Sequence, residues 1–236
     1  MVGTLINVAT VVAGTAIGTT VGARLPERIQ QRVLAGLGMI TLAIGIDLAL
    51  AWSGEDTSTS TPLYVLAGVL LGGIVGEALS IERRLEALGD RVQARLAGGD
   101  GHSTVSEGFV TASLLFCVGS LTVIGSIQDG LTGDYQTLAT KAVLDGFASI
   151  ALAATLGWGV GLAAITVLVV QGTITLGAGL FEELLVGEAL AVLTSAGGVT
   201  IIGIALKLLD VKDVKVGNFL PALVIAPALV GLVGLV

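Results

Sequence analysis

The sequence predicts an all-α integral membrane protein with about eight transmembrane helices. Of its 236 residues, 54% are hydrophobic and only 12% are charged, whereas an average soluble domain has about 25% charged residues. So few charges cannot cover a water-exposed surface, and lipid must therefore solvate much of the chain. The 35 glycines agree with this class, because glycine is commoner in membrane helices than in soluble ones. Residues 1–236 are expected to form a single polytopic membrane domain.

Eight apolar stretches are long enough to cross a bilayer, since a spanning helix needs about 20 mostly apolar residues. They cover residues 3–22, 33–53, 62–80, 109–127, 137–156, 158–178, 188–208 and 216–235. The fifth and sixth stretches are almost continuous at Gly157-Trp158-Gly159, so their division is the weakest. Arg24 and Arg28 follow the first stretch, with no basic residue before it, an order that favours a retained span over a cleaved signal peptide.

Charge in the loops predicts the orientation. The odd-numbered loops carry the basic residues, namely Arg24, Arg28 and Arg32, then Arg83, Arg84, Arg91 and Arg95, then Lys212 and Lys215. The even-numbered loops carry Glu55, Asp56, Asp129, Asp134, Glu182 and Glu183, with no Arg or Lys. By the positive-inside rule the odd loops are cytoplasmic, and both termini are expected outside.

The longest loop, residues 81–107, is expected to contain a short amphipathic helix at the cytoplasmic surface. Apolar residues recur there at helical spacing between charges, at Leu85, Leu88, Val92 and Leu96. This pattern is typical of an interfacial helix. The alternative is a solvated helical linker without membrane contact.

An internal repeat is suggested by three short matches at nearly constant offset. Residues 11–15 resemble 169–173, residues 44–48 resemble 202–206, and residues 67–76 resemble 222–231. Spans one to three would then correspond to spans six to eight. Because five spans separate each pair, the two copies would cross the membrane in opposite directions, as in the inverted repeats of secondary transporters.

Two glycine ridges predict close helix packing. Small residues at every fourth position let helix backbones approach each other in lipid. The ridges are Gly14, Gly18 and Gly22 on the first span, and Gly68, Gly72 and Gly76 on the third. Packing within one chain is the favoured interpretation, and a homo-oligomer formed through the ridges is the alternative.

The fifth span contains the principal candidate site. Lys141, Asp145 and Ser149 are spaced at i, i+4 and i+8, so they share one helix face. A charge at bilayer depth costs about 2.5–3.5 kcal/mol and is usually functional. Lysine before aspartate is the weaker order for a helical pair, so we expect a second anion near Lys141, with Asp129 or Asp134 as the nearest in sequence. A purely structural ion pair is the alternative.

Other polar residues lie in or near the spans. Ser113, Cys117 and Ser120 form a stripe on the fourth span that packs helices or, together with Ser126 and Gln128, lines a cavity. Asn7 and Gln171 lie within the first and sixth spans, where amides usually bridge helices. Glu77 lies near the cytoplasmic end of the third. We include Ser113, Ser120, Asn7, Gln171 and Glu77 among the candidates for a solute or ion path.

Several classes of function lack support. The sequence has no G-x-S-x-G, H-E-x-x-H, C-x-x-C or Walker pattern, so an enzyme is not expected. One cysteine and one histidine argue against a disulfide or a zinc site, and we expect no cofactor. A net charge of −7 argues against a nucleic-acid partner.

Three segments resemble a known family. GTLINVATVVAG, EGFVTASLLFCVGSLTVIGSIQDGLTGDY with KAVLDGFASI, and VGNFLPALVIAPAL are similar to the YqgA/YdfK-like membrane proteins, a domain-of-unknown-function family of bacteria and archaea. The resemblance covers essentially the whole chain and implies a multi-pass plasma-membrane protein, with no substrate and no functional residues to transfer. Our expectation is a transporter or channel for a small solute or ion. The alternative is a non-transporting scaffold or regulatory subunit.

Overall fold

The computed structural model describes residues 1–24, 26–54, 57–85, 87, 104–118, 120–185 and 187–233. All regular secondary structure in these residues is helical, which confirms the all-α class. The predicted amphipathic helix falls mainly on residues 88–103, which lie outside the described residues. The same is true of Glu55, Asp56 and the single histidine, His102.

Six helices in the described part of the chain are long and apolar enough to cross a membrane. They are α1 (Val2–Gly22), α2 (Glu27–Ala49, continued by the 3-10 helix η1, Leu50–Ser53), α3 (Thr61–Ala78), α7 (Gln136–Leu156), α8 (Gly159–Leu176) and α10 (Gly187–Leu208). The predicted division of the fifth and sixth spans is confirmed, since α7 ends at Leu156 and Gly157 adopts a φ of 77°. Glycine tolerates this left-handed conformation without strain.

Two of the eight predicted spans look different in the structure. The fourth is divided into α5 (Thr104–Cys117) and α6 (Ser120–Leu131), which are bent by 61° relative to each other. The eighth consists of the 3-10 helix η2 (Val216–Phe219) and the short α11 (Ala222–Val233). Pro221 lies between them, and proline cannot supply the backbone N–H that a continuous helix needs. Counting the bent pair as one span gives up to seven, so the eight-span count stays a prediction.

The described chain divides into two compact units that each take helices from both halves of the sequence. The first comprises Met1–Leu37, Arg83–Cys117 and Leu121–Ala178, and the second Gly38–Glu82, Val118–Ser120 and Gly179–Val236. These units do not coincide with the predicted copies, spans one to three and six to eight. The inverted repeat therefore stays a prediction.

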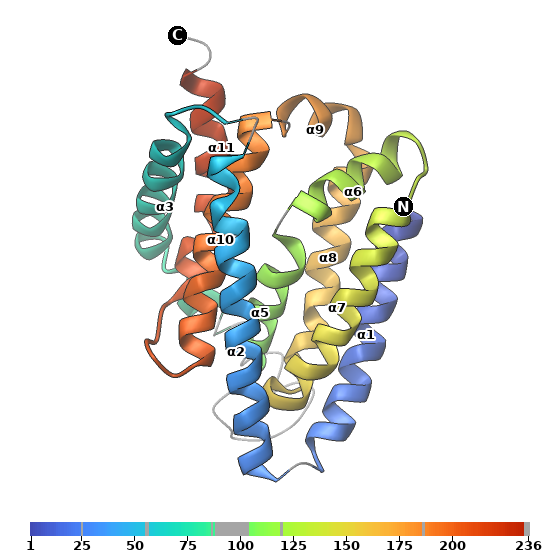
Figure 1. Cartoon of the computed structure of the whole chain (residues 1–236). Coiled ribbons are helices and arrows are strands. Elements are labelled where there is room, and N and C mark those ends of the chain that lie inside the picture. Colours follow the sequence, from blue (N-terminus) through green and yellow to red (C-terminus); the bar gives the residue numbers. More distant parts are fainter. Residues whose placement is uncertain are drawn as a thin grey trace. The chain divides into compact units, whose positions relative to one another are not determined.

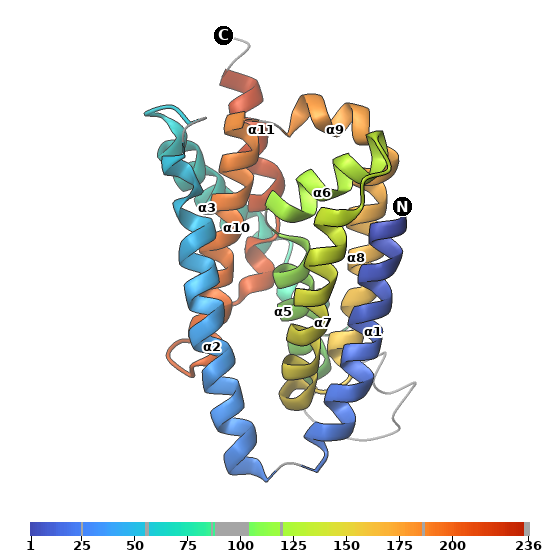
Figure 2. The same ribbon diagram turned by 45° about the vertical axis from the view of Figure 1, so that its right-hand side comes forward.

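In the first unit α1 packs directly against α7, and Figure 1 and Figure 2 show the two helices side by side. A Cβ added at Gly14, Gly18 or Gly22 would collide with backbone atoms of α7. In the same unit α5 packs on α8, where a Cβ at Gly159 would meet the backbone of Val105. The first glycine ridge thus sets the distance between α1 and α7.

In the second unit α3 packs against η2, α11 and α10. A Cβ at Gly68 or Gly72 would collide with Ala226 or Ala222 of α11, and one at Gly76 with the backbone of Asn218. A small core of Val65, Val192, Ala196 and Ala226 lies between these helices. Both glycine ridges are therefore buried within the chain, as favoured from the sequence, and neither is exposed for contact with a second copy.

Many large apolar side chains point outward from the helices. Phe147 on α7 is 69% exposed, and Leu66, Leu70 and Ile74 on α3 are exposed to a similar degree. Side chains of this kind are unfavourable in water but favourable in hydrocarbon. They agree with a surface solvated by lipid.

Candidate functional site

The centre of the candidate site is an ion pair between Lys141 and Asp145 on α7. The ammonium group of Lys141 donates a hydrogen bond to Oδ2 of Asp145, one helical turn away. Both residues are only 6% exposed. Each charge is thus neutralised by the other inside the first unit, which lowers the cost of placing them at bilayer depth.

Asn7 on α1 joins this pair across the α1–α7 contact. Its Nδ2 donates to Oδ2 of Asp145 at 2.8 Å, and the residue is fully buried. The close approach at Gly14 brings the two backbones near enough for so short a side chain to reach. The Nδ2 atom of this amide is thus hydrogen-bonded, whereas its Oδ1 atom has no hydrogen-bond partner among the described residues.

Two neighbours complete the surroundings of the pair. The hydroxyl of Ser149 donates to the backbone oxygen of Asp145 at 2.7 Å, so it shares the helix face but does not bind the carboxylate. The Nζ of Lys141 lies 6.0 Å from the ring centroid of Phe116, at the outer limit of a cation–π interaction. Phe116 is the penultimate residue of α5, so the charge pair lies close to the break in the fourth span.

Asp129 has a different role from the one expected. Its carboxylate accepts the backbone N–H of Gly3 at 3.1 Å and lies 2.8 Å from the amino group of Met1. The first N–H groups of a helix lack intrahelical partners and attract negative charge. Asp134 is exposed and accepts the N–H of Gln136. The expectation of a second anion beside Lys141 is therefore wrong for both aspartates, and Lys141 pairs with Asp145 in the part of the chain that is described.

A set of buried side chains on three helices has polar atoms with no partner among the described residues. They are Thr4 and Asn7 on α1, Ser126 on α6, and Gln171 and Thr175 on α8; the hydroxyls of Thr15, two turns further along α1, and of Thr194 and Ser195 on α10 are likewise unpaired but are not included in this set. Gln171 is fully buried and both of its amide atoms are unpaired. Leaving a buried polar group unpaired costs about 1–3 kcal/mol. These five side chains, with Lys141 and Asp145, are called the polar cluster below.

The three helices converge at the end of the first unit that contains Met1. Asp129 on α6 binds the start of α1, and its neighbour Gly130 lies against Thr175 of α8. A Cβ at Gly172 on α8 would lie 3.7 Å from the side chain of Met1. Thr4 and Asn7 follow within two turns of α1, and Gln171 lies one turn before Thr175 on α8. The five side chains therefore lie on three helices of one unit that contact one another near Met1.

The other predicted site residues lie elsewhere or pack helices. Ser113 donates to the hydroxyl of Thr166 at 3.0 Å and joins α5 to α8, which agrees with the packing interpretation. The side chain of Ser120 is outside those described. Glu77 belongs to the second unit, where it accepts Nδ2 of Asn218 at 2.6 Å. It is therefore not part of the polar cluster.

The side-chain hydrogen bonds of the second unit were not predicted from the sequence. Asn218 also accepts the backbone N–H of Glu82 at 2.8 Å, and Glu82 accepts the N–H of Gly217 at 2.6 Å. These bonds fix η2 to the end of α3. At the opposite end of α3, Glu188 accepts the hydroxyls of Ser58 and Thr61. Nothing local in the sequence marks Asn218 or Thr175, because isolated small polar residues are ordinary in membrane helices.

The fold and the polar cluster describe a multi-pass helical membrane protein with ionic and amide groups buried between its spans. The chain belongs to a family described as "Protein of unknown function (DUF554)", whose model matches residues 2–231. This confirms the resemblance seen in the sequence.

Two curated relatives extend over nearly the same length. The chain is 31% identical over 230 residues to the "Uncharacterized membrane protein YdfK" of Bacillus subtilis (strain 168), covering 98% of this chain and 96% of the relative. It is 29% identical over 229 residues to the "Uncharacterized protein YqgA" of Escherichia coli (strain K12), covering 96% and 94%. No solved structure matches the chain significantly.

Proposed function

We propose that the protein is a transporter or channel for a small solute or ion, with Lys141 and Asp145 beside the path. The observation that carries this proposal is the polar cluster, in which fully buried amide and hydroxyl groups have no partner among the described residues. Native proteins keep few such groups unless water, an ion or a functional requirement accounts for them. A polar molecule passing between α1, α6 and α8 would satisfy them in transit.

The broken fourth span gives a second line of support. Helices interrupted at membrane depth are tolerated where they are buried in protein or line a path, and transporters commonly place discontinuous helices at the binding site. Here the break follows Cys117, next to the residue whose ring faces Lys141. The bend thus adjoins the polar cluster.

A non-transporting scaffold or regulatory subunit is the second candidate. It is favoured by the mutual pairing and deep burial of Lys141 and Asp145, which a structural ion pair would also show. Under this candidate the pair and Asn7 serve only to hold α1 on α7. The two candidates differ in whether the polar cluster ever contacts a solute.

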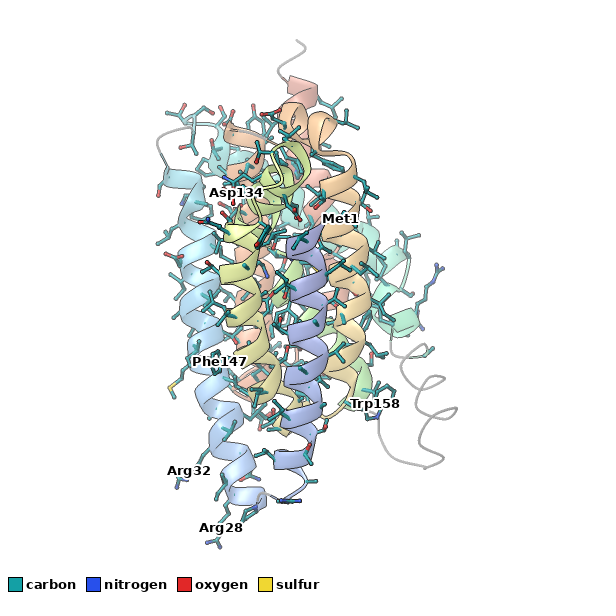
Figure 3. All side chains as sticks on the ribbon, turned by 90° about the vertical axis from the view of Figure 1, so that its right-hand side faces the viewer. Met1, Arg28, Arg32, Asp134, Phe147 and Trp158 are labelled. Atoms are coloured by element: carbon teal, nitrogen blue, oxygen red, sulfur yellow. The ribbon has the colours of Figure 1, made fainter. Side chains whose placement is uncertain are left out.

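We further propose that the protein lies in a prokaryotic plasma membrane with both termini outside, and that it has no catalytic role. Within the first unit, Figure 3 shows Met1 and Asp134 at one end and Arg28 and Arg32 at the other. This separation supports the assignment of Arg28 and Arg32 to a cytoplasmic loop. The relative from Bacillus subtilis is described as a membrane protein, which supports a membrane location.

Flux measurements on the purified chain in liposomes test the proposal. Neutral solutes are followed by light scattering and ions by entrapped dyes, in wild type and in the double variant Lys141→Met/Asp145→Leu. Replacing both members of a buried pair by apolar residues usually preserves folding, so melting temperature serves as the folding control. Flux that is lost in the double variant supports a path at the pair. If no probe crosses the liposome membrane, the result supports the scaffold. Equal flux in wild type and double variant would place the path elsewhere.

A further inference from the structure

We infer that the polar cluster binds a small, uncharged, hydrogen-bonding solute of the polyol or amide type. This inference rests on the proposed transport function and specifies its substrate class. It follows from the balance of charge in the cluster, the donors and acceptors that remain, and the cost of separating the ion pair.

The charges around the cluster are already balanced. Lys141 is paired with Asp145, and Asp129 is paired with the first turn of α1. An ion bound among these groups would therefore add an uncompensated charge to a buried region. Burying an unpaired charge is far more costly than burying a hydrogen-bonded neutral group. The balance favours an uncharged solute.

The remaining hydrogen-bonding groups are all neutral and of both kinds. The oxygen of Asn7 is an acceptor, because its nitrogen is held by Asp145. Gln171 offers two donors and an acceptor, and the hydroxyls of Thr4, Ser126 and Thr175 can do either. A ligand for such a site needs donors and acceptors close together in one small molecule, as in glycerol or urea.

A zwitterion fits less well. An amino acid would place its carboxylate on Lys141 and its ammonium on Asp145, and would have to separate the two residues. Removing the partner of a buried charge is strongly unfavourable, whereas an uncharged solute leaves the pair intact. Asp145 then acts as a positioning residue, because it fixes the amide of Asn7 so that the oxygen is available to the solute.

The test uses the full chain in liposomes and compares glycerol, urea, labelled alanine, and Na⁺, K⁺ and Cl⁻. We expect glycerol or urea to permeate, and Gln171→Leu to slow that flux by about tenfold, the equivalent of one to two lost neutral hydrogen bonds. The melting temperature should not fall, because the Gln171 amide has no partner among the described residues. The matched control is Gln136→Leu, which removes an exposed amide from the start of α7 and should leave flux unchanged.

Each outcome separates the two proposals. Flux of ions or alanine alone would overturn the substrate class and leave the transport function standing. No flux of any probe would overturn both. Glycerol or urea flux that Gln171→Leu does not alter would overturn the assignment of the site. A marked loss of melting temperature in Gln171→Leu would show that the amide is held by the protein itself, which also overturns it.

Discussion

Asn7 on α1 donates its side-chain amide to Asp145 on α7 at 2.8 Å, across 138 residues of sequence. Asn7 thus lies beside the Lys141–Asp145 pair, whose two charges balance each other. Its own amide oxygen, Oδ1, has no partner among the described residues. The bond between Asn7 and Asp145 depends on the glycine ridge of α1, which lets the two helix backbones touch. The packing of α1 and the chemistry of the polar cluster are therefore linked.

The buried ion pair predicts that Asp145→Asn is more harmful than removing both charges. The single change leaves Lys141 buried beside a neutral amide, and breaking a buried pair from one side costs about 3–5 kcal/mol. The variant Lys141→Met/Asp145→Leu removes both charged groups, so neither is buried without its partner. We expect Asp145→Asn to lower the apparent melting temperature in detergent markedly and the double variant to recover most of the loss.

The double-mutant cycle is completed by Asp145→Leu, which is the aspartate change present in the double variant, and by Lys141→Met. Lys141→Met should also be destabilising, because it leaves the Asp145 carboxylate with the Asn7 amide as its remaining side-chain partner among the described residues. Additive effects of the two single changes would contradict a direct pair, since residues in contact show coupling of about 0.5–3 kcal/mol.

Much of the fold could be predicted from the sequence, because apolar length and glycine spacing are local signals. Six long spans, the division at Gly157 and the intrachain use of the glycine ridges follow from such patterns. The break between α5 and α6 does not, because the residues around Gly119 are as apolar as the rest of the span. The position of η2 depends on hydrogen bonds that Asn218 donates to Glu77 and accepts from Glu82, two residues distant in sequence.

The site was predictable only in part for the same reason. Lys141 and Asp145 are conspicuous as charges in an apolar run, and their spacing predicts a shared face. Asp129 is equally conspicuous, but its partner is the backbone of Gly3, and a backbone N–H carries no sequence signal. Thr175 becomes notable only when its burial is known.

The second glycine ridge predicts a position-dependent effect of adding a methyl group. Gly72→Ala would place a Cβ 2.5 Å from backbone atoms of Ala222, and overpacking of this kind costs about 1–3 kcal/mol. Gly231→Ala on α11 is the matched control, because no described residue lies within 4 Å of its added Cβ. We expect a lower apparent melting temperature for Gly72→Ala and no decrease for Gly231→Ala. Equal melting temperatures would contradict the close contact of α3 with α11.

The role of Asp129 predicts local loosening of α1 when its carboxylate is removed. In Asp129→Ala the N–H of Gly3 loses its acceptor in a buried position, and loss of a helix-capping side chain costs about 0.5–2 kcal/mol. Hydrogen exchange of a peptide covering residues 2–10 should become faster. Asp134→Ala is the comparison, because Asp134 caps the start of α7 from an exposed position where water can replace it. Asp134→Ala should accelerate exchange of the residue 2–10 peptide less than Asp129→Ala does. A larger effect of Asp134→Ala on that peptide would contradict the assigned roles.

The proposed orientation predicts which end of the first unit is accessible from outside the cell. On a Cys117→Ala background, Asp134→Cys and Arg28→Cys each introduce one thiol at an exposed position, at opposite ends of that unit. A maleimide that cannot cross membranes should label the Asp134→Cys protein in intact cells. It should label the Arg28→Cys protein only after permeabilisation, because loops rich in arginine stay cytoplasmic. The reverse pattern would invert the topology, and labelling of both positions in intact cells would mean that these two ends do not lie on opposite sides of a bilayer.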